Sequence, residues 1–185
     1  MRVISGFYKG RVLFSPRGNS IRPTSDRIKE SIFNYIGTGI QDAKICDLFS
    51  GSGNLSIEAL SRGAKNAVMV DHSQQAIDLM KRNISHIGVV EKCRIVKMDT
   101  LQYLKLAAKN GEEFNFIFAD PPYLSRLNEP MMQRIVEGNL LTEGGLFVLE
   151  QSSRNAIPMA ILGLMNIAEK NFGDTTVMYF RQEGT

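Results

Sequence analysis

Residues 117–123, IFADPPY, run from three apolar residues into a carboxylate, two prolines and an aromatic ring. Proline fixes its own φ and restricts the residue before it, so a strand has to end here in a stiff corner. The carboxylate of Asp120 and the carbonyl of Pro121 can accept hydrogen bonds from the exocyclic amine of a purine. Pro122 helps to stiffen the corner, and Tyr123 can stack on the base. The segment predicts catalysis on such an amine; the alternative is a turn that merely ends a strand.

A glycine-rich turn, DLFSGSGN at residues 47–54, follows another apolar run. In a parallel α/β sheet the ligand lies beyond the carboxyl ends of the strands, where glycines allow close approach of the backbone. Asp71 lies 20 residues after Gly51, where an acid can accept hydrogen bonds from ribose hydroxyls. The NAD fingerprint would need a glycine in place of Ser56, and the Asp47 carboxylate is unfavourable beside a pyrophosphate. S-adenosylmethionine, with its ammonium, sulfonium and ribose, fits this pattern better.

A further acid, Asp99, ends the apolar run 93–99. It can hydrogen-bond the adenine amino group of the cofactor, helped by the backbone amide of Thr100. It can also cap the helix predicted to follow it, and the two roles can coexist. His72 is of interest mainly for its position beside Asp71.

The periodicity of the apolar residues predicts the elements that position these residues. Five short apolar runs occur along the chain, and the segments between the first four have helical spacing, which predicts a parallel α/β sheet. The runs are 44–50, 66–71, 93–99, 114–120 and 145–151. Residues 165–182 contain two β-rich runs joined through Gly173 and Asp174, typical of an antiparallel hairpin.

The N-terminal segment has a different pattern. Residues 2–6 and 10–15 are β-rich and predict a second hairpin. A helix is then expected to begin near Ser25 and to run to about Ile36, with apolar residues along one face.

Composition limits the class of protein. The chain has 185 residues, 43% hydrophobic and 22% charged, which is typical of a soluble globular protein with one core. No apolar run approaches the roughly 20 residues of a membrane span, and no secretory signal is present at the N-terminus, so a cytoplasmic location is expected. Cys46 and Cys93 lack metal-ligand spacing and are expected to be buried thiols, and no metal site is predicted.

The positive charge is concentrated near the N-terminus. Residues 1–30 carry seven basic and two acidic side chains, a net of +5, whereas the remaining residues carry 15 and 17, a net of −2. The seven basic residues are Arg2, Lys9, Arg11, Arg17, Arg22, Arg27 and Lys29. Such a distribution favours contact with a polyanion such as nucleic acid. A solvated basic face is the alternative.

The glycine turn, VMVDHS at 68–73 and IFADPPY together resemble the class I S-adenosylmethionine-dependent methyltransferases of exocyclic amines. RVISGFYKGR at 2–11 and IRPTSDRIKESIFN at 21–34 are similar to the bacterial 16S rRNA guanine-N2 methyltransferase family of the guanine-966 type. The resemblance covers nearly the whole chain. It implies a Rossmann-like α/β fold with a seven-stranded, mostly parallel sheet and a C-terminal antiparallel hairpin. It also implies an N-terminal segment, 1–40, before a methyltransferase domain, 41–185.

The resemblance assigns roles to individual positions. The cofactor-binding residues are expected to be Asp47, Phe49, Ser50, Gly51, Gly53, Asn54, Asp71, His72, Asp99 and Thr100. Arg22, Thr24, Asp26 and Arg27 are expected to close over the cofactor or to contact RNA. Arg126 is a candidate phosphate contact, with an exposed loop arginine as the alternative. The expected partner is 16S rRNA or a small-subunit assembly intermediate, and the enzyme is expected to be a monomer.

Three other functions remain open at this point. One is methylation of adenine in DNA or of glutamine in protein, although the glutamine enzymes usually carry asparagine at the position of Asp120. Another is an RNA-binding assembly factor without turnover, which would be expected to lose the acidic or aromatic groups at the site. An NAD oxidoreductase is disfavoured by Ser56 and Asp47.

Overall fold

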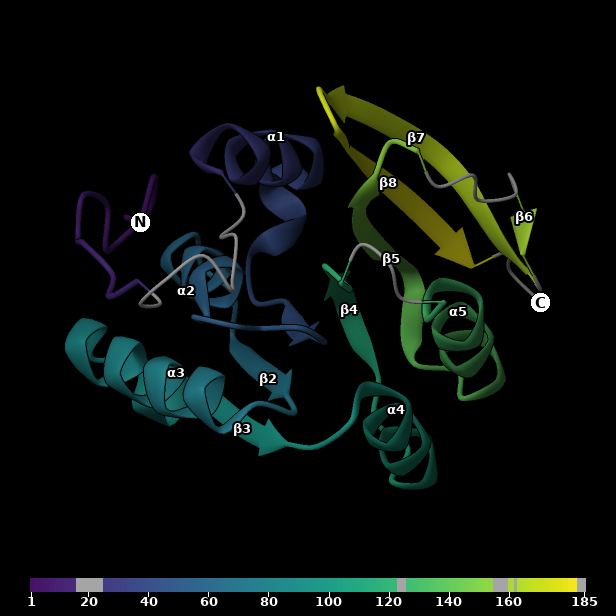
Figure 1. Cartoon of the computed structure of the whole chain (residues 1–185), viewed down its shortest axis with the longest axis horizontal. Helices are drawn as coiled ribbons and strands as arrows, with labels where there is room; N and C mark the ends of the chain where they lie inside the picture. Colours follow the sequence, from purple (N-terminus) through teal and green to yellow (C-terminus); the bar gives the residue numbers. More distant parts are fainter. Residues whose placement is uncertain (16–24, 123–125, 155–159, 162, 183–185) are drawn as a thin grey trace. The chain divides into compact units, whose positions relative to one another are not determined.

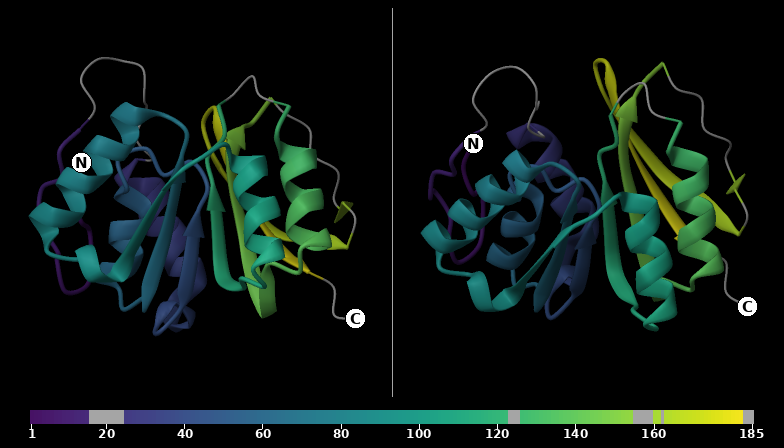
Figure 2. Two further views of the ribbon diagram at one scale, coloured as in Figure 1. Left: turned by 90° about the horizontal axis from the view of Figure 1, so that it is seen from below. Right: turned by 60° about the horizontal axis from the view of Figure 1, so that its bottom comes forward.

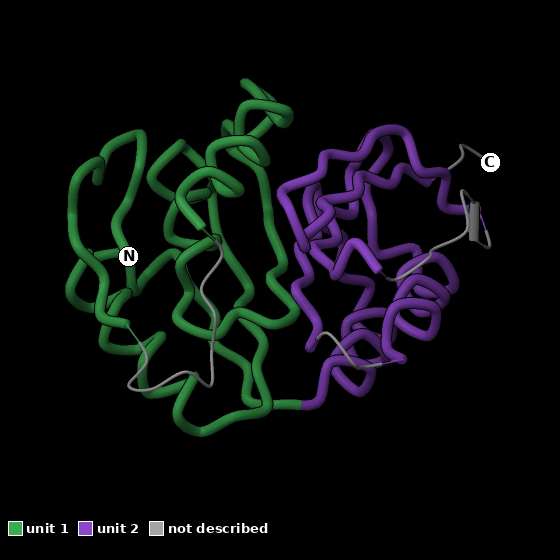
Figure 3. Tube along the Cα trace, turned by 45° about the horizontal axis from the view of Figure 1, so that its top comes forward, with its two compact units in different colours: residues 1–98 green, residues 99–185 purple. Residues whose placement is uncertain are grey.

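The computed structural model describes residues 1–15, 25–122, 126–154, 160–161 and 163–182 (Figure 1). The chain divides into two compact units, residues 1–98 and 99–185 (Figure 3). Among the described residues, no helix is long and apolar enough to cross a membrane.

Unit 1 contains a three-stranded parallel sheet in the order β3-β2-β1. Its elements are α1 (Asp26–Ile36), η1 (Gly37–Ile40), β1 (Lys44–Asp47), α2 (Asn54–Ser61), β2 (Asn66–Asp71), α3 (Gln74–Ile87), η2 (Val90–Lys92) and β3 (Cys93–Lys97). Cys46 of β1 is in register with Val68 of β2, and Val68 with Arg94 of β3. β1 and β2 are almost entirely buried, as strands covered on both faces should be. The predicted alternation of strands and helices is confirmed here.

Helix α1 begins and ends where the sequence predicts. The hydroxyl of Ser25 caps it by accepting a hydrogen bond from the backbone N–H of Ile28 at 3.3 Å. Ile28, Ile32 and Phe33 are buried along one face, and Gly37, at φ 59°, ends the helix.

The N-terminal hairpin is much shorter than predicted. Its described residues contain one isolated antiparallel bridge, Arg2 to Val12, instead of two extended strands. The reason is that the intervening backbone donors bind α2. Ile4 and Ser5 donate to the Glu58 carboxylate at 2.8 and 3.1 Å. Phe7 and Tyr8 donate to the carbonyl and hydroxyl oxygens at the end of the same helix.

Unit 2 contains a mixed sheet in the order β4-β5-β8-β7-β6. Its elements are α4 (Thr100–Lys109), β4 (Phe114–Ala119), α5 (Asn128–Glu137), β5 (Leu141–Ser152), β6 (Ala160–Ile161), β7 (Leu164–Phe172) and β8 (Thr175–Gln182). β4 and β5 are parallel, whereas β8 is antiparallel to both β5 and β7. Helices α4 and α5 lie side by side on one face of this sheet (Figure 2).

The C-terminal hairpin through Gly173 and Asp174 is confirmed. Two details of unit 2 differ from the prediction. The described residues contain eight strands instead of seven, because Ala160–Ile161 adds the short strand β6. Helix α5, which follows the fourth apolar run, was also not predicted.

Candidate cofactor and catalytic site

Asp47, the last residue of β1, is buried beneath the glycine turn. The hydroxyls of Ser50 and Ser56 both donate to its Oδ2, at 3.0 and 2.8 Å. Burial raises the pKa of Asp47 to about 6, although these hydrogen bonds act in the opposite direction. Both hydroxyls are neutral and do not balance the negative charge of the carboxylate. A cation bound beside Asp47 would therefore favour its ionised form.

Asp71, the last residue of β2, fixes the glycine turn that follows β1. Its Oδ2 accepts a hydrogen bond from the backbone N–H of Gly51 at 3.0 Å, and its Oδ1 accepts one from Ser73 at 2.8 Å. The backbone N–H of Ser50 also donates to the carbonyl of Val70 at 3.0 Å. The structure therefore brings together the turn and the acid that were predicted to share one ligand. The contact of Asp71 with a ribose stays a prediction.

Two other residues predicted to bind the cofactor, at the carboxyl ends of β1 and β2, are less buried. The His72 side chain is 77% exposed, and its Nδ1 lies 3.7 Å from Oδ1 of Asp71. Phe49 is half-buried, next to the buried Ser50. Their contacts with a cofactor remain predictions.

Gly53 adopts a conformation that other residues rarely take. Its φ is 77°, and a Cβ at this position would lie 2.4 Å from Cε of Met69. Gly51, at φ 53°, shares the left-handed conformation. The turn is closed by a hydrogen bond from the N–H of Gly53 to the carbonyl of Ser50 at 2.7 Å. Glycine is needed here to pack the turn against β2.

We expect Gly53→Ala to lower the free energy of unfolding by about 2–3 kcal/mol, from left-handed strain and crowding of Met69. The matched control is Gly173→Ala, at φ 63° with no atom within 4 Å of the new Cβ. The free energy of unfolding of that variant should fall only by the cost of the left-handed strain, about 1–2 kcal/mol. Urea denaturation of both variants measures the difference; equal losses would show that contact with Met69 is unimportant.

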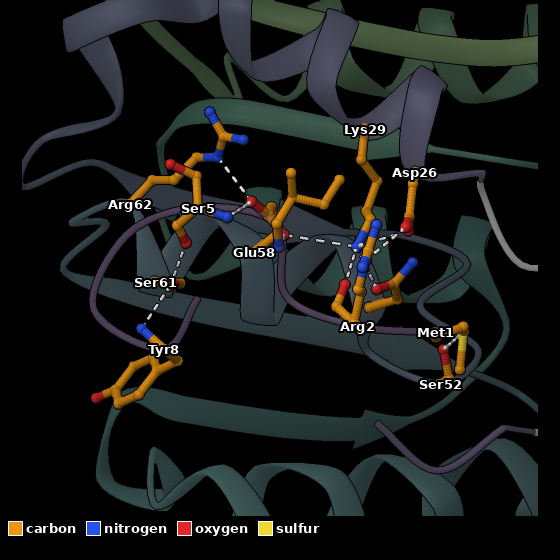
Figure 4. Close-up of polar contacts among 12 residues, drawn as sticks. Met1, Arg2, Ser5, Tyr8, Asp26, Lys29, Ser52, Glu58, Ser61 and Arg62 are labelled. Carbon is orange, nitrogen blue, oxygen red and sulfur yellow. Dashed lines mark hydrogen bonds and ion pairs between the residues drawn. The ribbon is translucent and has the colours of Figure 1, made fainter. Parts of the chain in front are cut away.

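Asn54, at the start of α2, has a structural partner. Its Oδ1 accepts a hydrogen bond from Nζ of Lys29 at 2.8 Å, and both side chains are buried. Lys29 also donates to the carbonyl of Arg2 at 2.7 Å, and its Nζ lies 3.5 Å from Oε2 of Glu58 (Figure 4). The amide oxygen of Asn54 is thus engaged in fixing α1, so a role for Asn54 in cofactor binding rests on its other atoms.

This buried network was not predicted. Lys29 was expected to be one of the basic residues that meet a polyanion, yet residues 29, 32, 33 and 36 have the spacing of one buried helix face. Glu58 is also fully buried and receives a second ion pair from Arg62 at 2.8 Å.

The predicted basic arm therefore needs correction. Lys29 is buried, and Arg2 pairs with Asp26, a predicted substrate-binding residue, at 3.1 Å. Arg27 is exposed on α1. Arg22 and Thr24 lie outside the described residues. The charge available to a polyanion is smaller than the count of seven suggested.

In unit 2, Asp120 and Pro121 directly follow β4. Asp120 is half-buried, Pro121 is buried and Pro122 is exposed. β4 ends at Ala119, as expected for a strand that runs into two prolines. Tyr123 lies outside the described residues, and its role as a stacking partner stays a prediction.

Asp99 caps helix α4, by accepting a hydrogen bond from the N–H of Gln102 at 3.1 Å. The capping role is confirmed, and the contact with adenine stays a prediction. Thr100 is buried in the first turn of this helix, and Arg126 is exposed before α5.

The cysteines also differ from each other. Cys46 is buried as predicted, whereas Cys93 is only half-buried. Both are free thiols, and burial raises the pKa of Cys93 to about 12. Within the described ranges, no group of histidine, cysteine, aspartate and glutamate is arranged to hold a metal ion.

The described elements match solved structures along nearly the whole chain. One, titled "Putative methyltransferase yhhF from Escherichia coli", is 28% identical, with a TM-score of 0.87, over 99% of this chain and 98% of that one. The fold is therefore that of the Rossmann-like methyltransferases, with a C-terminal antiparallel hairpin.

The family model described as "Conserved hypothetical protein 95" matches residues 1–181, and the chain belongs to this family. A Bacillus subtilis relative named "Putative rRNA methyltransferase YlbH" is 38% identical over 100% of both chains. "Ribosomal RNA small subunit methyltransferase D" of Escherichia coli is 29% identical over 99% of this chain and 90% of its own. These matches confirm the family resemblance seen in the sequence.

Proposed function

We propose that this protein is a methyltransferase that transfers a methyl group from S-adenosylmethionine to the N2 amine of a guanine in 16S rRNA. The observation that carries this proposal is the Asp-Pro-Pro corner after β4, in a chain whose relatives are named as rRNA methyltransferases. The guanine-966 type is proposed from the resemblance of residues 2–11 and 21–34. We propose further that it acts in the cytoplasm as a monomer, on 16S rRNA or on a small-subunit assembly intermediate.

The residues of unit 1 fit the proposed cofactor. Asp47 offers a buried carboxylate to the ammonium group, and the turn at Gly51 and Gly53 lets the backbone approach closely. Asp71 is held at the end of β2, where an acid can accept hydrogen bonds from ribose hydroxyls. S-adenosylmethionine supplies a methyl group on a positively charged sulfur, which becomes a neutral thioether after transfer.

The corner after β4 supplies the acceptors for the guanine amine. Its lone pair is delocalised into the ring, which makes it a poor nucleophile. The Asp120 carboxylate and the Pro121 carbonyl accept hydrogen bonds from the two N–H groups of the amine. These hydrogen bonds favour a tetrahedral nitrogen whose lone pair is free. As the new N–C bond forms, the nitrogen becomes positively charged, and the carboxylate stabilises that charge. The nitrogen then releases one proton, and no covalent enzyme intermediate is required.

Tritiated S-adenosylmethionine tests the proposed function. The purified protein should label 16S rRNA, or small-subunit particles from cells that lack the enzyme, and nuclease digestion should yield N2-methylguanosine. DNA and bulk protein serve as parallel substrates. Label in either of them, or in N6-methyladenosine, would contradict the proposal.

The raised pKa of Asp47 predicts how cofactor affinity depends on pH. The ionised carboxylate binds the ammonium group, and its population rises about tenfold between pH 5 and 7 for a pKa of about 6. The α-ammonium stays protonated over this range, since such amines titrate near pH 7.7–8. Affinity measured by calorimetry should therefore rise about tenfold from pH 5 to 7.

Asp47→Asn, which cannot ionise, is the matched variant. It should bind more weakly at pH 7, with little dependence on pH. A wild-type affinity that is constant from pH 5 to 7 would rule out an ionising Asp47 at the ammonium group.

A further inference from the structure

An exposed patch of aromatic and basic side chains lies on unit 1, where the N-terminal loop runs beside the end of α3. We call it the Phe14 surface; its residues are Tyr8, Arg11, Phe14, Arg82 and His86, which contact one another or the end of α3. Phe14 is 40% exposed, and Tyr8 is half-buried. A single exposed apolar side chain needs no explanation, so what matters here is how the Phe14 ring is held and which charges lie beside it.

Phe14 is held firmly although its ring is exposed. Its backbone N–H donates to Oδ1 of the buried Asn83 at 2.8 Å, and Nδ2 of Asn83 donates back to its carbonyl at 3.2 Å. The ring contacts Arg82, whose guanidinium carbon lies 4.4 Å from the ring centroid. The His86 ring also contacts it, tilted by 57° with the centroids 5.2 Å apart. A fixed ring beside a guanidinium is a preorganised platform for stacking.

The charge of this surface is positive. The surface carries the guanidinium groups of Arg11 and Arg82. Arg2 does not add to this charge because it pairs with Asp26. The nearest acidic residue on α3 is Asp78, one turn before Arg82, where it accepts a hydrogen bond from Gln74. The Arg11 side chain is positioned by a hydrogen bond from its Nη1 to the carbonyl of Ile87 at 3.0 Å. Its guanidinium carbon lies 5.7 Å from the centroid of the Tyr8 ring. Guanidinium groups interleaved with exposed rings match a nucleic acid, whose phosphates are negative and whose bases stack.

The Phe14 surface is connected to the glycine turn. Nδ2 of Asn83 also donates to the carbonyl of Ser52 at 2.8 Å, so one side chain joins Phe14 to the Gly51–Gly53 segment. A ligand on this surface would lie next to the proposed cofactor site.

We propose that the Phe14 surface binds the rRNA substrate, with an unpaired base stacked on Phe14 and a phosphate bound by Arg82. This inference rests on the proposed function and assigns Phe14 and Arg82 to RNA binding, a role that was not predicted for either residue. It explains why a buried asparagine fixes an exposed ring beside a guanidinium group.

Two conservative variants test the two contacts separately, with unmodified 16S rRNA transcribed in vitro as the probe. Phe14→Leu keeps an apolar side chain but removes stacking, and we expect about five- to tenfold weaker binding with an unchanged salt dependence. Arg82→Gln removes the charge, and we expect about three- to tenfold weaker binding. Its plot of log affinity against log salt should also be less steep by about 0.7.

The matched control is Arg134→Gln, on the exposed side of α5, which should bind as the wild type does. S-adenosylmethionine affinity and melting temperature show whether each variant is folded. If the wild type binds and methylates the RNA while Phe14→Leu and Arg82→Gln both bind equally well, this inference alone is overturned. If the wild type neither binds nor methylates this RNA, nor small-subunit particles from cells that lack the enzyme, the proposed function fails as well.

Discussion

Asp120→Ala is expected to slow methyl transfer by about 10²- to 10⁴-fold while leaving S-adenosylmethionine affinity within about threefold of the wild type. The reason is that the variant loses the negative acceptor for the guanine amine, whereas the groups proposed to bind the ammonium group and the ribose of the cofactor belong to unit 1. Single-turnover transfer of a tritiated methyl group to 16S rRNA measures the chemical step, and calorimetry measures cofactor affinity.

Two further variants sharpen this test. Asp120→Asn keeps a carbonyl acceptor without the charge, so it should be more active than Asp120→Ala and less active than the wild type. Asp174→Ala, in the exposed turn between β7 and β8, should transfer at the wild-type rate. Full activity of Asp120→Ala would rule out the acceptor role, and an equal loss of cofactor affinity or of thermal stability would indicate a structural role instead.

Lys29→Met should cause the largest loss of stability among the variants considered, about 3–5 kcal/mol of unfolding free energy. The side chains of Lys29 and Glu58 are both fully buried, 3.5 Å apart. Removing the ammonium leaves the Glu58 carboxylate with less compensating charge and deprives the Arg2 carbonyl and Asn54 of their donor. Urea denaturation measures the change.

Arg2→Ala is the control, because it breaks the exposed pair with Asp26 and should cost no more than about 1 kcal/mol. The double variant Lys29→Met/Glu58→Leu should recover only part of the loss. It removes both buried charges, but it leaves the backbone N–H groups of Ile4 and Ser5 without their acceptor. A Lys29→Met loss as small as that of Arg2→Ala would show that the buried pair contributes little.

Local patterns predicted most of the elements. The apolar runs located β1, β2 and β4 because strands buried on both faces are short and continuously apolar. The run at 93–99 also located β3, although none of the residues of β3 is fully buried. Helix α5 was not predicted from the sequence, although Pro130 is compatible with the first turn of a helix. Met131 and Ile135, four residues apart and both buried, are the signal that could have revealed it.

The part of the candidate site that lies at the carboxyl ends of strands could be predicted from the sequence. Asp47 and Asp71 end adjacent parallel strands, which is enough to place Asp71 near the turn that follows β1. The partners of Lys29 and Asn83 depend on tertiary packing. The position of Asn83 between Met80 and Ile87 indicates burial, but no local pattern identifies Phe14 as its partner.

The long sequence separation of these contacts has a consequence for folding during synthesis. Ile4 and Ser5 bind Glu58, and Phe14 binds Asn83, which is 69 positions further along the chain. A ribosome that adds about 5–20 residues per second needs about 3–14 seconds to make that interval. The N-terminal loop must therefore emerge first and yet be fixed among the last parts of unit 1, with its aromatic residues exposed to chaperones and to RNA in the meantime.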